Sequence, residues 1–289
     1  MQMKHICSAF LLLLGAFMAR GDSAAADGAR QKPAEPAKVM SLNLCADPYL
    51  MGFAAPDQVL ALTPQSRDAA LSAFVAAAQN FPVSDGRIET IAALQPDIVI
   101  VSSYSDPYRN RLVEKLGIEV LTLDAANSYA AARHEIMRLG VAIGRQAQAQ
   151  DYLEKLDAAL QAAQKSHNRK TKILPLQRRN LTAGEGHITD EIIALAGGDN
   201  IGRNTTSRLM GRISLESALA AKADFILLNE TGERPDSRGM EFLTHPALAQ
   251  AYPPQRRLTL PNNLLVCAGA TTPLAVRRLA DQLDAAIRD

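Results

Sequence analysis

The residues that could bind a small molecule gather first in two loops of the N-terminal half. Residues 43–49 (NLCADPY) and 102–110 (SSYSDPYRN) each follow an apolar segment that is expected to form a β-strand. In parallel α/β folds, the loops after the strands line the ligand crevice. Three of the six tyrosines fall in these loops, where a tyrosine either packs against a helix or contacts a ligand. The candidate contacts there are Asn43, Cys45, Tyr49, Tyr104, Tyr108 and Arg109.

Three loops of the C-terminal half offer similar side chains. They are residues 181–188 (LTAGEGHI), 229–239 (NETGERPDSRG) and 263–272 (NLLVCAGATT). The glycines of GEGH allow backbone to approach a ligand closely, and His187 either contacts the ligand, binds a metal or does neither. No set of metal ligands can be assigned. The candidate contacts there are Glu185, His187, Glu230 and Cys267, with Arg234 and Arg238 as further cations.

Cys45 and Cys267 are expected at the same crevice, one from each half of the chain. Three interpretations are open. The two thiols could be small apolar filler, or they could line the ligand as soft donors. They could also form a disulfide across the crevice, because exported thiols that meet tend to oxidise.

Charge and motifs weigh against nucleic-acid binding and against the common enzyme classes. The chain has 31 Lys and Arg against 30 Asp and Glu, which is no excess of positive charge for a nucleic acid. It lacks the motifs G-x-S-x-G, G-x-x-x-x-G-K, H-E-x-x-H and C-x-x-C. A Ser/His/Asp set assembled from distant residues stays open, so an exported α/β enzyme is kept as an alternative.

The first 26 residues have the features of a secretory signal peptide. MQMKH is a short basic start, ICSAFLLLLGAFMA is an apolar run, and Ala24 and Ala26 offer a small-residue cleavage site. An uncleaved anchor is the alternative, although the run is short for a bilayer. Residues 27–38, rich in Pro, Ala and charge, predict a flexible leader. We therefore expect the remainder of the chain to be exported.

The remaining sequence predicts two α/β lobes joined by a long helix. Apolar strands alternate with helical segments over 39–140 and again over 169–289, a pattern typical of parallel sheets. Residues 141–168 are mostly helix formers and predict a linking backbone helix. A coiled coil is disfavoured there because Ala and Gln fill too many heptad positions.

Three local expectations accompany this division. The Ala-rich residues 67–79 are expected to be helical. KILPLQ is expected to form a strand, which Pro175 weakens. TDEIIALAGGDN is expected to form a helix with Thr189 as its N-cap.

One sequence unit occurs twice, once in each half. GRIETIAALQPDIVIVSS (86–103) and GRISLESALAAKADFILLNE (211–230) both contain Gly-Arg-Ile, one glutamate, a short helix, an aspartate and an apolar strand. The glutamates, Glu89 and Glu216, precede their aspartates by the same interval. Taken alone, a glutamate at this place favours a helix N-terminus.

These segments together resemble a known family. IETIAALQPDIVIVSS, GIEVLTLD, LTAGEGHITDEIIALAGGDNI and LESALAAKADFILL, in this order, are similar to periplasmic substrate-binding proteins of ABC importers for vitamin B12, haem and ferric siderophores. The resemblance covers the whole mature chain and implies a ligand cleft between two lobes on a backbone helix. It also implies that Glu89 and Glu216 dock onto the two membrane subunits of an importer with its own ATPase.

We expect the protein to be a periplasmic monomer with no cofactor and no enzymatic activity. Its expected ligand is an iron or cobalt chelate, whose identity stays open: the chain has no Trp, and 4% of its residues are aromatic. A free Zn or Mn carrier of the related class is the alternative, but such a site requires several His and carboxylates converging on one ion.

Overall fold

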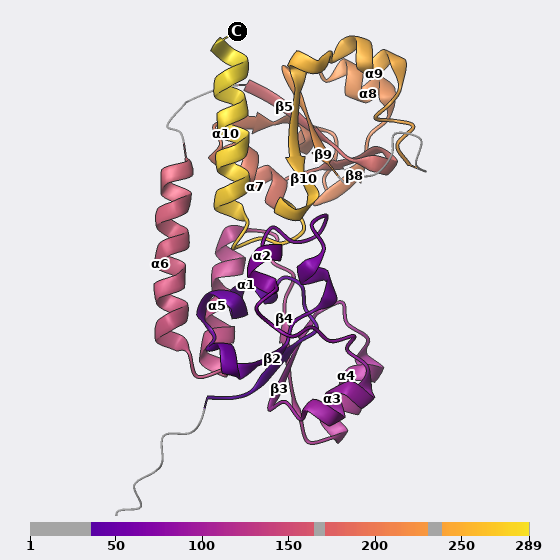
Figure 1. Cartoon of the computed structure of the whole chain (residues 1–289). Helices are drawn as coiled ribbons and strands as arrows, with labels where there is room; N and C mark the ends of the chain where they lie inside the picture. Colours follow the sequence, from indigo (N-terminus) through magenta and orange to yellow (C-terminus); the bar gives the residue numbers. More distant parts are fainter. Residues whose placement is uncertain (1–35, 165–170, 231–238, 289) are drawn as a thin grey trace, which may run out of the picture. The chain divides into compact units, whose positions relative to one another are not determined.

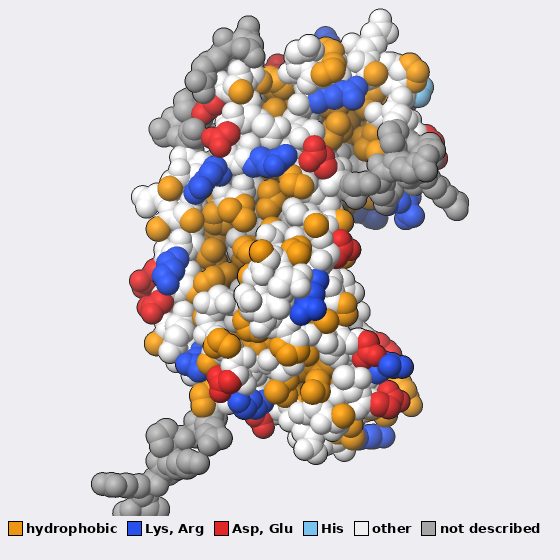
Figure 2. Space-filling model, in the orientation of Figure 1, with side chains coloured by type: hydrophobic (Ala, Val, Ile, Leu, Met, Phe, Trp, Pro, Cys, Tyr) orange, Lys and Arg blue, Asp and Glu red, His pale blue; other side chains and the backbone are white. Residues whose placement is uncertain are grey.

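The computed structural model describes residues 36–164, 171–230 and 239–288. The expected signal peptide, most of the expected leader, Arg234 and Arg238 lie outside these residues. Within the described ranges, no helix is long and apolar enough to cross a membrane. The face shown in Figure 2 carries basic and acidic side chains in mixture rather than a continuous basic surface.

The N-terminal lobe, residues 36–142, is built on a parallel four-stranded sheet of order β2-β1-β3-β4 (Figure 1). Its core lies on both faces of the sheet because side chains alternate along the strands. Ile98 and Ile100 pack with α1, α5 and α6 (Gln146–Ala163), whereas Val99 and Val101 pack with α3 and α4. The strands are β1 (Val39–Ser41), β2 (Val59–Ala61), β3 (Ile98–Ser102) and β4 (Glu119–Leu123). The helices are α1 (Asp47–Phe53), α2 (Val75–Ala78), α3 (Ile88–Leu94), α4 (Pro107–Lys115) and α5 (Tyr129–Ala142).

The C-terminal lobe, residues 171–288, repeats this plan with a parallel sheet of order β10-β9-β5-β7 and adds an antiparallel pair, β6-β8. Ile173 packs with α7 and α10, whereas Leu174 and Leu176 face α8 and α9. The strands are β5 (Thr171–Leu176), β6 (Leu181–Ala183), β7 (Gly198–Asn200), β8 (Met210–Arg212), β9 (Phe225–Glu230) and β10 (Arg257–Pro261). The helices are α7 (Ile188–Leu195), α8 (Leu215–Ala220), α9 (Pro246–Ala251) and α10 (Thr272–Arg288).

One helix, α6 (Gln146–Ala163), runs alongside both lobes (Figure 1). Its Leu153 is buried in the core of the N-terminal lobe, and its Leu160 is buried in the core of the C-terminal lobe. Leu156 packs against both cores. Because bending a helix breaks its backbone hydrogen bonds, α6 resists changes in the angle between the lobes.

Pro175 lies in a central strand without costing a ladder bond. Strand β5 pairs with β7 only as far as Ile173. At Pro175, β5 pairs on its other edge alone, with Leu227 of β9. The missing N–H of the proline therefore falls where β5 has already lost one neighbour.

Two local predictions are wrong. Residues 67–79 do not form one helix: only α2 is α-helical there, because the side chains of Asp68 and Ser72 accept hydrogen bonds from the N–H groups of Ala70 and Phe74. Such local bonds stabilise turns at the expense of helix. The N-cap of α7 is His187 rather than Thr189, since Nδ1 of His187 accepts from the Thr189 N–H at 3.1 Å.

Candidate functional site

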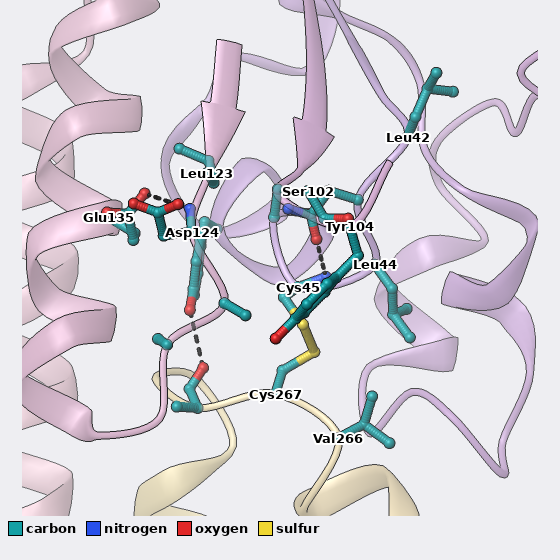
Figure 3. A pocket seen from close by; sticks show the side chains of 16 residues that line it. Leu42, Leu44, Cys45, Ser102, Tyr104, Leu123, Asp124, Glu135, Val266 and Cys267 are labelled. Atoms are coloured by element: carbon teal, nitrogen blue, oxygen red, sulfur yellow. Dashed lines mark hydrogen bonds between the residues drawn. A yellow bond between two sulfur atoms is a disulfide. The ribbon is translucent and has the colours of Figure 1, made fainter. Parts of the chain in front are cut away.

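A cavity of about 290 Å³ lies where the two lobes meet, at the carboxyl ends of the N-terminal strands (Figure 3). The N-terminal lobe supplies the loops after β1, β3 and β4, and the C-terminal lobe supplies the loop that precedes α10. Its surface is mostly apolar. The lining residues are Leu42, Asn43, Leu44, Cys45, Ala46, Tyr49, Ser102, Tyr104, Leu123, Asp124, Ala125, Ala126, Glu135, Val266, Cys267 and Ala268.

Asn43 shapes the loop after β1. Its Nδ2 donates to the carbonyl oxygen of Val101 at 3.4 Å, and its Oδ1 accepts from the Cys45 N–H at 2.9 Å. The first bond ties the loop to β3, and the second turns the chain so that Cys45 borders the cavity. Asn43 is buried, and these two bonds position the loop.

Tyr49 connects this side of the cavity to the other lobe. Its Oη donates to the carbonyl oxygen of Ala268 at 2.9 Å. Burial raises the pKa of Tyr49, so the hydroxyl remains a donor. Gly269, which follows in the chain, has a φ of +94°, and a Cβ there would lie 2.4 Å from the Tyr49 Oη. The two lobes therefore meet in close contact beside the cavity.

Tyr104 is the aromatic side chain most available to a ligand. It stands in the turn after β3, lines the cavity and is 83% exposed. In Figure 3, the Tyr104 side chain extends from the N-terminal lobe. An exposed aromatic ring at a cavity mouth can cover an apolar ligand while its hydroxyl stays in water.

Two carboxylates, Asp124 and Glu135, also border the cavity. Glu135 is buried and pairs with Arg138 at 2.8 Å, and its Oε2 accepts from the Asp124 N–H at 3.1 Å. Its charge is therefore compensated, and it holds the loop after β4 in place. Asp124 itself is exposed. The rule that loops after strands face the crevice, applied to β4 as well, could have found both the loop and Asp124.

Cys45 and Cys267 form a disulfide whose sulfurs border the cavity (Figure 3). Their Cα atoms are 5.4 Å apart, although 222 positions separate them in sequence. Of the three interpretations left open by the sequence, the structure agrees with the disulfide. This bond joins the N-terminal lobe covalently to the C-terminal lobe at the cavity.

The carboxyl of Asp47, at the start of α1, is buried next to this loop. Burial raises its pKa to about 7, against a smaller opposing effect of hydrogen bonds from Ser41 and Thr63. Its Oδ2 accepts from both the N–H and the hydroxyl of Thr63, at 3.2 and 2.5 Å. Asp47 therefore ties α1 to the end of β2 and titrates near neutral pH.

The structure brings five of the ten predicted ligand contacts together around the cavity: Asn43, Cys45, Tyr49, Tyr104 and Cys267. The other five lie outside its lining, and ligand contact by them stays a prediction. Tyr108 and Arg109 lie in the first turn of α4, with Tyr108 62% exposed. Glu185 is exposed before α7, and Glu230, at the end of β9, lies 3.8 Å from Arg278.

His187 is engaged as the N-cap of α7, and burial lowers its pKa. A neutral ring is required there, because Nδ1 must accept a hydrogen bond. Among the described residues, no three His, Cys, Asp or Glu side chains are placed to hold a metal ion together.

Glu89 and Glu216 occupy matched positions in the two lobes. Each is exposed and is the second residue of its helix, α3 or α8. Each helix leads into a strand, β3 or β9, that is central in its sheet. The match extends to backbone contacts. The carboxylate of Asp97 accepts from the Lys38 N–H at 2.7 Å, and that of Asp224 accepts from the Lys172 N–H at 2.8 Å.

Comparison with known proteins agrees with this architecture. The family model described as periplasmic binding protein matches residues 50–259. No curated protein matches the chain in sequence. Among solved structures, the periplasmic heme-binding protein RhuT from Roseiflexus sp. RS-1 has a TM-score of 0.69 and 20% identity, and the match covers 87% of this chain and 99% of that chain.

Two structures from Vibrio cholerae have the same fold. The periplasmic heme-binding protein HutB has a TM-score of 0.69 at 18% identity, and the match covers 86% of this chain and 98% of that chain. The periplasmic vitamin B12 binding protein BtuF has a TM-score of 0.61 at 18% identity, with coverage of 88% and 99%. Since the family model spans most of the two lobes and the cavity lies between them, the chain belongs to the periplasmic binding protein family.

Proposed function

We propose that this protein captures a metal chelate, such as haem, a corrinoid or a ferric siderophore, and delivers it to an ABC importer. The observation that carries the proposal is a cavity lined by both lobes in a member of the periplasmic binding protein family. Structures of similar fold include proteins described as binding heme and vitamin B12. The chelate is cargo in this proposal and not a cofactor.

The cavity favours an apolar part of such a chelate. Its volume of about 290 Å³ lies at the lower end of the range for small-molecule sites, which is roughly 300–1,000 Å³. A large chelate therefore enters with one edge only. The cavity lining formed by the described residues is rich in Leu and Ala, includes no Lys or Arg, and has Asp124 as its exposed charge. An anionic group on the chelate would be repelled by Asp124 and would stay outside the cavity.

Glu89 and Glu216 are the proposed contacts with the importer. Their matched places in two equivalent units suit a partner made of two equivalent membrane subunits. Opposite charge on the partner would steer the encounter and fix the register of docking. In the described ranges, both carboxylates are exposed and so available to a partner.

The location and assembly of the protein follow the same proposal. Export to the periplasm through the signal peptide expected over residues 1–26 places the protein where such an importer collects its cargo. One monomer suffices, because a single chain supplies both lobes of the cavity and both glutamates.

Binding can be tested by titrating the exported, oxidised protein with haemin, cyanocobalamin and ferrichrome. Because the chain has no Trp, the signal should come from calorimetry or from ligand absorbance rather than from tryptophan fluorescence. We expect saturable one-to-one binding of one of the three, with the ligand recovered unchanged. Absence of binding by all three, or chemical conversion of the bound compound, would overturn the proposal. Native mass spectrometry of protein taken from the periplasm would identify the natural ligand.

A further inference from the structure

The disulfide between Cys45 and Cys267 lies in the wall of the cavity rather than at a distance from it. Both cysteines are half-buried and both border the cavity. Cys45 belongs to the loop 42–46 after β1, and Cys267 belongs to the loop 265–271 before α10. Figure 3 shows the sulfur–sulfur bond joining these two loops beside Tyr104 and Val266.

The loop 265–271 has no helix or strand of its own, so its position depends on what holds it. Within its own lobe it is held by the Gly269 N–H, which donates to the Thr272 hydroxyl oxygen at the start of α10 at 3.0 Å. The Thr271 hydroxyl closes the loop on itself by donating to the Cys267 carbonyl oxygen at 2.5 Å. Against the other lobe it is held by the disulfide, by the hydrogen bond from Tyr49 to Ala268 and by Ala270, which is buried in the core of the N-terminal lobe. Val266, which is 40% exposed, projects from this loop and completes the lining.

Other polar contacts between the two lobes lie away from the cavity lining, among them a bond from the Tyr129 N–H to the Glu191 carboxylate at 2.7 Å. Asn262 and Asn263 donate to the carbonyl oxygens of Ala70 and Ala69 at 3.1 and 2.8 Å. None of these four residues lines the cavity. They fix the lobes to each other away from the cavity, whereas the disulfide, the Tyr49 hydrogen bond and the packing of Ala270 act on the cavity loops themselves, and only the disulfide is covalent.

We propose that the Cys45–Cys267 disulfide sets the width of the ligand cavity and thereby its affinity and selectivity. A disulfide confines its two Cα atoms to a separation of about 4.4–6.8 Å, whereas one hydrogen bond allows the loops to move apart and return. The covalent bond therefore keeps the cavity at one width before the ligand arrives. A site that is already formed binds its matched ligand more tightly than one that must be ordered. This inference rests on the proposed function of the cavity.

The first test compares the oxidised protein with the double variant Cys45→Ala, Cys267→Ala. Haemin, cyanocobalamin and ferrichrome are titrated into each. We expect roughly tenfold or greater loss of affinity for the preferred ligand in the variant. We also expect a smaller ratio between the affinities for the first and second ligands. Equal affinity and equal selectivity in the two proteins would overturn the inference while leaving the proposed function intact.

The second measurement needs no ligand and tests the inference even if the double variant folds poorly, because it uses the wild-type protein. Hydrogen exchange of the wild-type protein is compared with and without a phosphine reductant, with circular dichroism to confirm folding. We expect faster exchange in residues 42–46 and 265–271 after reduction and unchanged exchange in α6. Unchanged exchange in both loops would contradict the inference. Failure of the oxidised protein to bind any of the three chelates would overturn the proposed function, and this inference with it.

Discussion

The hydroxyl of Tyr49 donates to the carbonyl oxygen of Ala268 at 2.9 Å and joins the two lobes across 219 positions of sequence. The hydroxyl is enclosed: Tyr49 is 3% exposed, and a Cβ on Gly269 would lie 2.4 Å from its oxygen. A contact this close between lobes leaves no room for an added methyl group. It therefore offers a sensitive place to test how the lobes are held.

We predict that Tyr49→Phe lowers the free energy of unfolding by about 1–2 kcal/mol. The substitution removes the donor and leaves the buried Ala268 carbonyl oxygen without this partner. Urea denaturation measures the loss. Tyr108→Phe serves as the control, because Tyr108 is 62% exposed. Equal stability of Tyr49→Phe and wild type would show that the hydrogen bond contributes nothing.

We predict that Gly269→Ala destabilises by about 2–4 kcal/mol, since strain at positive φ and a steric clash with Tyr49 both act. Gly117→Ala separates the two effects, because Gly117 has a φ of +78° but no atom within 4 Å of an added Cβ. We expect Gly117→Ala to lose less stability than Gly269→Ala.

The same substitution should be less costly when the oxygen of Tyr49 is absent. In the Tyr49→Phe background, Gly269→Ala keeps its backbone strain but loses its closest clash. A double-mutant cycle in urea should therefore give a favourable coupling energy of about 1 kcal/mol. Strict additivity of the two losses would contradict the predicted contact.

The buried carboxyl of Asp47 should make stability depend on pH. Its pKa is 3.8 in the unfolded chain and about 7 in the folded protein, so the folded protein holds the proton more tightly. The free energy of unfolding should fall by about 4 kcal/mol in total as pH rises from about 4 to about 7. Above that pH it should level off.

Asp47→Asn should flatten that dependence, because the amide does not titrate. Thermal unfolding at pH 5, 6, 7 and 8 measures the difference in stability between wild type and variant. As pH rises, the variant should gain stability relative to wild type. Asp151→Asn, on the exposed face of α6, is the matched control and should keep the wild-type slope. A parallel pH dependence in wild type and Asp47→Asn would rule out Asp47 as the source.

The double variant Glu89→Ala, Glu216→Ala should bind its chelate normally and fail in uptake. Neither glutamate borders the cavity, so affinity should not change. Losing one partner of a desolvated ion pair commonly costs about 2–5 kcal/mol, so docking should weaken strongly. Uptake of labelled ligand by cells that carry the importer is the measurement. The charge-matched control is Glu114→Ala with Glu154→Ala, two exposed glutamates on α4 and α6. Normal transport by the first double variant would refute the docking role.

The alternation of apolar strands with helical segments was enough to predict two α/β lobes, because a buried parallel strand needs an unbroken apolar run. DIVIVSS and DFILLN became β3 and β9 almost to the residue. The Ala-rich residues 67–79 were mispredicted because helix propensity takes account neither of the local turns that the Asp68 and Ser72 side chains close nor of distant partners. In the fold, the carbonyl oxygens of Ala69 and Ala70 accept hydrogen bonds from Asn263 and Asn262. No local pattern reveals a partner more than 190 positions away.

The candidate site was predictable where it follows strand topology and unpredictable where it depends on how loops pack. Cys45 and Cys267 could be placed at one crevice from sequence, but their bonding depends on a Cα separation that only the fold defines. Tyr104 and Tyr108 have the same residue type and lie in the same loop segment. Yet only Tyr104 borders the cavity, because Asp106 caps α4 and its first turn carries Tyr108 away from the lining.

The bond between Cys45 and Cys267 also turns most of the polypeptide into a closed ring that contains α6, the sheet of the C-terminal lobe and every strand of the N-terminal sheet except β1. A protease that cuts once anywhere inside this ring would not release a fragment, and the two pieces would separate only on a reducing gel. If the oxidised chain were pulled by its two ends, tension would pass from Cys45 across the sulfurs to Cys267. The residues between them would carry no load, and only the segments outside the ring would extend.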